Sequence, residues 1–91
     1  MTFTLHYHHA VRDEDLPLID RRNRERIQRA IEERLRTAPH DYGEPLRKSP
    51  KGYWKLRVGD YRVVFRVIDY QVWILAIRHR KSVYPDFTAR K

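Results

Sequence analysis

The fold is decided by residues 53–77, which read YWKLRVGDYRVVFRVIDYQVWILAI. Residues 53–58, 61–68 and 72–77 are rich in β-branched and aromatic side chains, which is typical of strands. Only the short polar breaks 59–60 and 69–71 separate them. Because breaks of this length join neighbouring antiparallel strands, we predict a three-stranded meander with two tight hairpins.

A two-residue turn at Gly59-Asp60 fixes the register of the first hairpin. It pairs Val58 with Tyr61, and counting outward along both strands sets the remaining pairs. One side is apolar and should form the core face: Trp54, Leu56, Val58, Tyr61, Val63 and Phe65. On the opposite side Arg57 faces Arg62, Lys55 faces Val64 and Tyr53 faces Arg66. The register therefore collects cations on one face of the sheet.

Like charges that lie opposite each other on a sheet reduce stability, so a face that keeps Lys55, Arg57, Arg62 and Arg66 suggests an anion-binding role. Arginine favours bidentate contacts with phosphate, and Tyr53 and Trp73 are expected close by on the same face, where they could stack on bases. The alternative is a merely solvated face, because edge strands often carry lysine to prevent aggregation.

Upstream of the meander, Phe3, Leu5 and Tyr7 alternate with polar residues, which predicts another half-buried strand. A short helix is expected over residues 10–16, with Pro17 interrupting it. Asp20 can cap a second helix that ends at Pro39, and residues 40–52 suit an ordered loop. The buried stripe of the second helix falls at Ile27, Ala30, Ile31, Leu35 and Ala38.

These elements predict an α+β fold in the order β-α-α-β-β-β. The sheet is expected to be antiparallel, with a helical hairpin packed on one face. A chain of 91 residues has room for a single domain, here residues 1–91.

The composition narrows the class of partner. Lys and Arg number 20 against 12 Asp and Glu, so the net charge is +8, which predicts a polyanionic partner. No stretch suits a membrane span, a signal peptide or a lipid-binding amphipathic helix, so nucleic acid is preferred to a membrane and a cytoplasmic location is expected. The absence of cysteine excludes disulfides, thiol catalysis and cysteine-based zinc sites.

Three segments, residues 42–47, 54–65 and 77–84, together resemble the RelE/ParE toxin superfamily, and the resemblance spans nearly the whole chain. It implies a RelE-like fold and the toxin of a toxin–antitoxin system. RelE-like toxins cut messenger RNA in the ribosomal A site by driving a ribose 2′-hydroxyl onto the adjacent phosphate, without metal or cofactor. The expected partners are then mRNA, the ribosome with its 16S rRNA, and a cognate antitoxin with an acidic toxin-binding segment, in a hetero-oligomeric complex.

The resemblance also implies roles for residues. Lys55 and Arg62 would bind the scissile phosphate, Tyr84 would be the base or the platform for the attacked nucleotide, and Arg80 would assist the leaving group. Arg78 and Lys81 are alternatives to Arg80. Tyr53 stands where the best-studied RelE carries a second lysine, so a different division of proton transfer is expected. The remaining RNA-binding candidates are Arg47, Lys48, Lys51, Tyr53, Arg57, Arg66, Arg78, His79 and Lys81.

Other titratable residues carry weaker signals. His79 suits either a general acid or a structural hydrogen bond. His6, His8 and His9 have no nearby carboxylate, so a metal site is not expected there. The arginines between residues 21 and 36 alternate with glutamates and suit a solvated face, while residues 13–15 complement a helix dipole.

Two other functions fit the same residues. ParE-type inhibitors of DNA gyrase share the fold but act by binding a protein, and they generally lack the set Lys55, Arg62, Arg80 and Tyr84. A non-catalytic RNA-binding module would also carry aromatic and basic residues.

Overall fold

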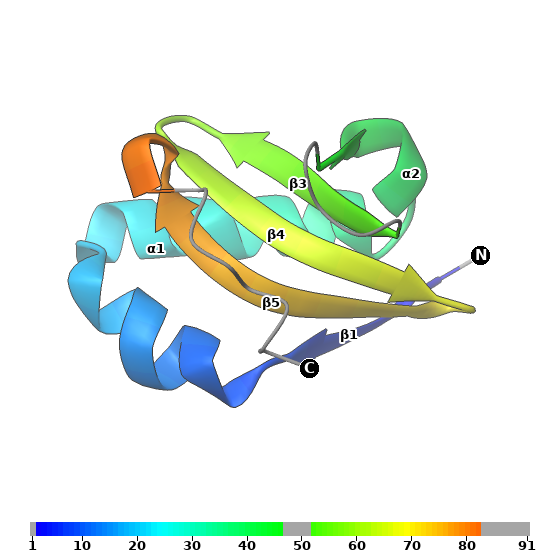
Figure 1. The fold of residues 1–91 in the computed structure, drawn as a ribbon, viewed down its shortest axis with the longest axis horizontal. Coiled ribbons are helices and arrows are strands. Elements are labelled where there is room, and N and C mark those ends of the chain that lie inside the picture. The colour runs from blue at the N-terminus through cyan, green and yellow to red at the C-terminus, as the bar shows by residue number, and fades with distance from the viewer. Residues whose placement is uncertain (1, 47–51, 83–91) are drawn as a thin grey trace.

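The computed structural model describes residues 2–46 and 52–82. Five strands form one sheet in the order β1-β5-β4-β3-β2 (Figure 1). The strands are β1 (Thr4–Tyr7), β2 (Glu44–Pro45), β3 (Tyr53–Val58), β4 (Tyr61–Ile68) and β5 (Gln71–His79). The helical segments are η1 (Val11–Asp15), η2 (Leu16–Leu18), α1 (Arg21–Ala30), η3 (Ile31–Leu35), α2 (Pro39–Tyr42) and η4 (Arg80–Ser82).

The predicted meander is confirmed, including its register. Val58 pairs with Tyr61, Arg57 with Arg62, and the remaining pairs follow as expected out to Tyr53 with Arg66. Gly59 has a φ of 59°, in the left-handed region that a two-residue hairpin turn requires and that glycine adopts at little cost.

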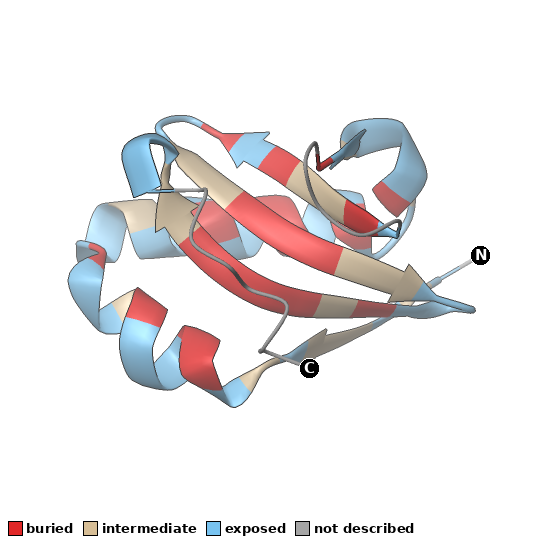
Figure 2. Ribbon diagram, in the orientation of Figure 1, coloured by how far each residue is buried: buried red, intermediate tan, exposed pale blue. Residues whose placement is uncertain are grey.

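The helical segments cover one face of the sheet, as predicted (Figures 1 and 2). The Asp20 side chain caps α1 by accepting a hydrogen bond from the backbone N–H of Asn23, at 3.3 Å. The main core joins the two layers and contains Val11, Ile19, Ile27, Ala30, Ile31, Leu35, Leu56, Val58, Val63, Phe65, Val72, Ile74 and Ile77. The predicted α+β class is therefore confirmed.

The sheet is mixed, so the expectation of a wholly antiparallel sheet was wrong. β1 pairs with β5 in parallel, from Thr4 with Gln71 to Tyr7 with Ile74. Because β3 and β5 are both antiparallel to β4, β3 runs in the same direction as β1, and the helices between them form a crossover. Alternating polarity in residues 3–7 predicts a strand but does not encode its direction.

Residues 40–46 are also more regular than the predicted loop. Pro39 starts α2 instead of ending the preceding helix, since the first turn of a helix does not need its N–H group. Glu44 and Pro45 then pair with Lys55 and Trp54 as the edge strand β2. The first helical stretch likewise continues through Pro17 to Leu18, because Pro17 lies in the first turn of η2.

A β-bulge in β5 reshapes the face of the sheet opposite the helices, called the outer face below. Val64 pairs with Ala76 but Phe65 with Ile74, so Leu75 is an extra residue. Leu75 and Ala76 join a second apolar cluster with Leu46, Tyr53 and Val64, against which Trp73 packs. The centre of the outer face is therefore apolar, and charged residues surround it.

Candidate functional site

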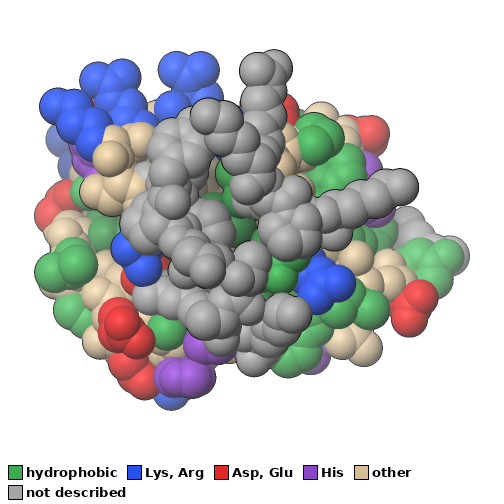
Figure 3. All heavy atoms as spheres, in the orientation of Figure 1, with side chains coloured by type: hydrophobic (Ala, Val, Ile, Leu, Met, Phe, Trp, Pro, Cys, Tyr) green, Lys and Arg blue, Asp and Glu red, His purple; other side chains and the backbone are tan. Residues whose placement is uncertain are grey.

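Three arginines form a row across the outer face. Arg62 on β4 pairs with Arg57 on β3 and with Arg78 on β5. Figure 3 shows Lys and Arg side chains gathered at one corner of this face, at the upper left, over the turn between β3 and β4. Such a row costs stability unless an anion offsets the repulsion, so it is the strongest candidate for a binding site.

Arg62 is held in place by the β3–β4 turn. One terminal nitrogen, Nη1, donates to the carbonyl oxygens of Gly59 at 3.0 Å and Tyr61 at 2.9 Å. These two bonds fix the direction of the guanidinium group, which reduces the entropy lost when the group binds a ligand.

A pocket of about 160 Å³ lies at the β3 edge of the sheet. It is lined by Arg34, Tyr42, Glu44, Lys55, Leu56, Arg57 and Arg62. We call it the β3-edge pocket. Four of its side chains are cationic and one is a carboxylate, so it attracts anions and also contains a group that can accept a proton. It brings together Lys55, Arg57 and Arg62, three of the residues that the sequence analysis selected.

Arg80 and His79 lie beside the same turn. The backbone N–H of Arg80 donates to the Asp60 carbonyl at 2.7 Å, and its side-chain Nε lies 3.8 Å from an Asp60 carboxylate oxygen. His79 Nδ1 accepts from the Lys81 backbone N–H at 3.2 Å, and its ring meets the Tyr61 ring edge-on. Arg80 at the start of η4 and Arg62 on β4 therefore both contact the turn between β3 and β4. Tyr84, Arg47, Lys48 and Lys51 lie outside the described residues.

The aromatic side chains are less available than expected. Tyr53 is only 5% exposed, because Leu46 and the bulged part of β5 pack around it, and the Arg66 guanidinium lies 5.2 Å from its ring centroid. A ring this buried has no free face for stacking on a base. Trp73 is half-buried and stacks on His6, with ring centroids 4.4 Å apart.

Asp15 is a structural residue that the sequence analysis missed. It is 3% exposed, and it accepts a hydrogen bond from the Ile77 backbone N–H at 3.0 Å. Its other oxygen lies 3.3 Å from Nε of Arg78. Asp15 therefore covers part of the β5 edge beyond β1 and anchors one arginine of the row. The sequence did carry one signal of this burial, because Asp15 lies four residues after the apolar Val11 and so on the same face of the helix.

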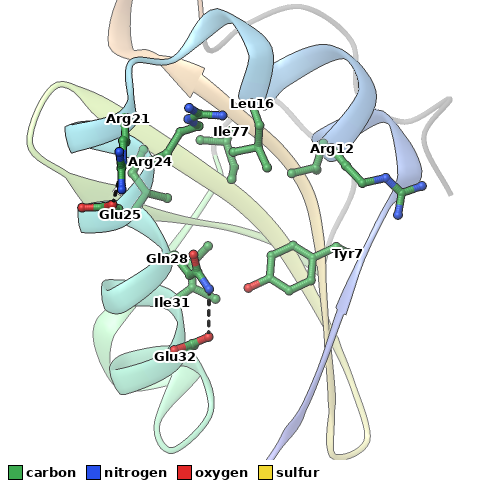
Figure 4. A pocket seen from close by; sticks show the side chains of 12 residues that line it. Tyr7, Arg12, Leu16, Arg21, Arg24, Glu25, Gln28, Ile31, Glu32 and Ile77 are labelled. Carbon is green, nitrogen blue, oxygen red and sulfur yellow. Dashed lines mark hydrogen bonds and ion pairs between the residues drawn. The ribbon is translucent and has the colours of Figure 1, made fainter.

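A second cavity, of about 560 Å³, lies on the helical side between η1 and α1 (Figure 4). Its apolar lining includes Val11, Leu16, Ile27, Ile31 and Ile77. Its border carries both charges, Arg12, Arg21 and Arg24 together with Glu25 and Glu32. The Tyr7 hydroxyl points into the cavity toward Gln28. Burial, reinforced by the charge of Glu32, raises the pKa of Tyr7 above its usual value.

Within residues 2–46 and 52–82, no group of three or more His, Asp or Glu side chains could hold a metal ion. The rings of His8 and His9 stack on each other, and His8 Nδ1 accepts from the Ala10 backbone N–H at 3.1 Å. None of the helices in the described part of the chain is long and apolar enough to cross a membrane.

The chain resembles known toxins in sequence. The family model described as the ParE toxin of the type II toxin–antitoxin system parDE matches residues 7–84. Toxin RelE of Mycobacterium tuberculosis is 42% identical over 48 residues, and the matched region spans half of this chain and half of that protein.

Solved structures agree with the sequence comparison. The toxin–antitoxin complex RelBE2 from Mycobacterium tuberculosis contains a chain with a TM-score of 0.80 and 28% identity, covering 88% of this chain and 93% of that one. A chain of the RelB–RelE complex from Methanococcus jannaschii matches with a TM-score of 0.65 and 25% identity. The match covers 87% of this chain and 94% of that one. A mutant of E. coli RelE in the free state is 21% identical, with a TM-score of 0.64, and the match covers 99% of this chain and 94% of that one. This likeness supports the fold alone.

Proposed function

This chain belongs to the RelE/ParE superfamily of toxins of type II toxin–antitoxin systems, and from that premise we propose that it cleaves messenger RNA bound to the ribosome. The observation that carries the proposal is the β3-edge pocket, in which Lys55, Arg57 and Arg62 converge from two strands. Function in this fold is decided by the site, and concentrated arginine and lysine suit a phosphate.

The reaction needs three contributions from the protein. A base removes the proton from the ribose 2′-hydroxyl, whose oxygen attacks phosphorus, while cations stabilise the added negative charge on the phosphoryl oxygens. The bond from phosphorus to the 5′-oxygen then breaks, that oxygen takes up a proton, and the products are a 2′,3′-cyclic phosphate and a 5′-hydroxyl.

The residues divide these tasks as follows in our proposal. Lys55 and Arg62 bind and stabilise the phosphate, and Arg80 assists the leaving oxygen from η4, beside the β3–β4 turn. The resemblance assigns Tyr84 as base or stacking platform. Within the described residues, the pocket adds the Glu44 carboxylate as another group able to accept the 2′-hydroxyl proton.

We propose that the toxin is held inactive in a hetero-oligomeric complex by a cognate antitoxin with an acidic segment. The net charge of +8 and the basic outer face favour such a partner, and the similar chains of known structure include toxins in complex with antitoxins. The cavity of Figure 4 has an apolar lining that suits the apolar side chains of the same segment.

Inhibition of DNA gyrase is the second candidate, and the match to the ParE family model favours it. A gyrase inhibitor acts by binding a protein and does not need cations gathered around a small pocket. The residues of the β3-edge pocket therefore separate the two candidates.

The test is controlled expression in bacteria, followed by mapping of message ends across the transcriptome. We expect codon-positioned cuts with the wild-type chain and their loss with Arg62→Ala and Tyr84→Phe, while Arg29→Ala, which removes the same charge from an exposed part of α1, keeps them. DNA damage signalling with intact messages would instead favour gyrase. Growth arrest with both messages and DNA intact would favour simple RNA binding.

A further inference from the structure

Arg34 and Tyr42 line the β3-edge pocket from the helical layer, and the resemblance gives a role to neither of them. We infer that this pair forms a subsite for one nucleotide of single-stranded RNA, next to the phosphate bound by Lys55 and Arg62. The inference rests on the proposed function and extends its site around the edge of the sheet.

The fold brings the pair to the strands through a short connection. Arg34 lies on η3 and Tyr42 ends α2, and the turn between these two helices places the Arg34 guanidinium carbon 5.8 Å from the Tyr42 ring centroid. Glu44 follows directly on β2, which pairs with Lys55. Because β2 is only two residues long, its pairing with β3 ends at Lys55, and the pocket continues along that edge to Leu56 and Arg57.

The chemistry of the pair suits a nucleotide. Tyr42 is 53% exposed, so its ring can stack on a base, and the guanidinium group beside it can contact the attached phosphate. Tyr42 thus offers the stacking surface that the sequence analysis expected at the buried Tyr53. The pocket is small, about 160 Å³, so it suits a single base or phosphate group of one strand and not a duplex.

Glu44 favours RNA over an acidic peptide as the occupant. Its carboxylate lines the pocket among the cations and can accept hydrogen bonds from the amino or imino groups of a base. The carboxylate side chains of an acidic peptide carry no hydrogen-bond donor for this group. We therefore expect the subsite to influence which base is bound beside the cleaved bond.

Arg34 is exposed like the other arginines of the stretch from α1 to η3, but its surroundings differ. Arg21, for example, forms an exposed ion pair with Glu25 one turn away, at 3.2 Å. Arg34 instead lies beside an aromatic ring at the border of a cation-rich pocket. The matched controls are the exposed Arg29 on α1 and the exposed Tyr70 in the turn between β4 and β5.

The experiment measures binding of a fluorescein-labelled single-stranded RNA of six nucleotides by anisotropy, at several salt concentrations. Tyr42→Ala should weaken binding roughly tenfold, whereas Tyr42→Phe, which keeps the ring, should stay close to wild type. The slope of log affinity against log salt is negative, and Arg34→Ala should make it shallower by about 0.7, the value for one phosphate contact with a single strand. Arg29→Ala and Tyr70→Ala should leave affinity and slope unchanged.

Cleavage of ribosome-bound message is measured with the same proteins, which separates the inference from the proposed function. If the wild type cuts and the Arg34 and Tyr42 variants match the controls in binding, cleavage rate and base preference, the subsite is wrong and the nuclease stands. If the wild type binds RNA through Arg34 and Tyr42 without cutting, the nuclease is wrong and the subsite stands. If it neither binds nor cuts, both are wrong. If the wild type cuts, and the Arg34→Ala and Tyr42→Ala variants lose binding while the controls keep it, both proposals are supported.

Discussion

Asp15 and Arg62 show how single side chains position the candidate site. Asp15 brings a buried carboxylate to the β5 edge, where it meets the Ile77 N–H and the Arg78 guanidinium group. Arg62 is held by two carbonyl groups of a turn. Both arrangements hold arginines against the repulsion of the row, so they maintain the concentration of positive charge that an anion would use.

We predict that Asp15→Ala lowers the free energy of unfolding by about 2–4 kcal/mol, because it removes the carboxylate that a buried N–H and a largely buried guanidinium both use. Asp15→Asn should cost less, since its amide oxygen can still accept from Ile77. Urea denaturation measures both. Asp13→Ala, which removes only an exposed ion pair with Arg12, is the control and should change stability by less than about 0.5 kcal/mol. Equal effects at positions 13 and 15 would show that Asp15 has no anchoring role.

At this scale the sequence predicted the faces of the strands but not the accessibility of each side chain. Lys55, Arg57, Arg62 and Arg66 lie on the outer face because a two-residue turn and a period of two determine it. The burial of Tyr53 depends on Leu46, across the β2–β3 connection, and on a bulge at Leu75 in another strand. Tertiary packing of this kind leaves no local pattern to read.

At the scale of elements, β2 is the shortest strand among the described residues and completes the β3-edge pocket with Glu44. Gly43 precedes it, and a Cβ atom at this position would lie 2.5 Å from Cζ of Phe65 and 2.9 Å from the Pro39 carbonyl oxygen. Its backbone is extended, with φ of −87°, so space and not conformation requires glycine. The close approach of the chain to Phe65 is therefore what places Glu44.

We predict that Gly43→Ala lowers the free energy of unfolding by roughly 1–3 kcal/mol, because the added methyl group overpacks a fully buried ring. The measurement is thermal or urea denaturation. Phe65→Leu removes the clashing ring atom, so the double variant should be more stable than the sum of the two single changes predicts. Strict additivity would contradict the close approach.

Sequence patterns predicted the meander, the capped helix and the buried stripe as far as Leu35, because each depends on local periodicity or a local turn. Ala38 was wrongly included in the stripe, since the helix ends before it and its side chain is half-buried. The patterns did not give β2 or the direction of β1. Two residues carry no periodicity, and a strand looks the same in either direction.

At the scale of the whole molecule, cations from two layers converge on one edge. Arg34 from the helical layer and Lys55, Arg57 and Arg62 from the sheet meet in one pocket, in a chain whose net charge is already +8. The composition predicted a polyanionic partner, but only the fold shows that these four cations meet in one pocket. The larger cavity near Tyr7 lies on the helical side, so the molecule has room for a nucleic acid and a protein partner on different surfaces.

The central claim is that the β3-edge pocket carries out RNA cleavage, and a reconstituted reaction tests it most directly. Purified protein is added to ribosomes programmed with a defined message, to the same message without ribosomes, and separately to DNA gyrase with relaxed plasmid. We predict cleavage only on the ribosome, with a 2′,3′-cyclic phosphate end, a rate reduced roughly a hundredfold or more by Arg62→Ala, and no effect on supercoiling. Intact message together with inhibited supercoiling, or full cleavage by Arg62→Ala, would contradict the claim.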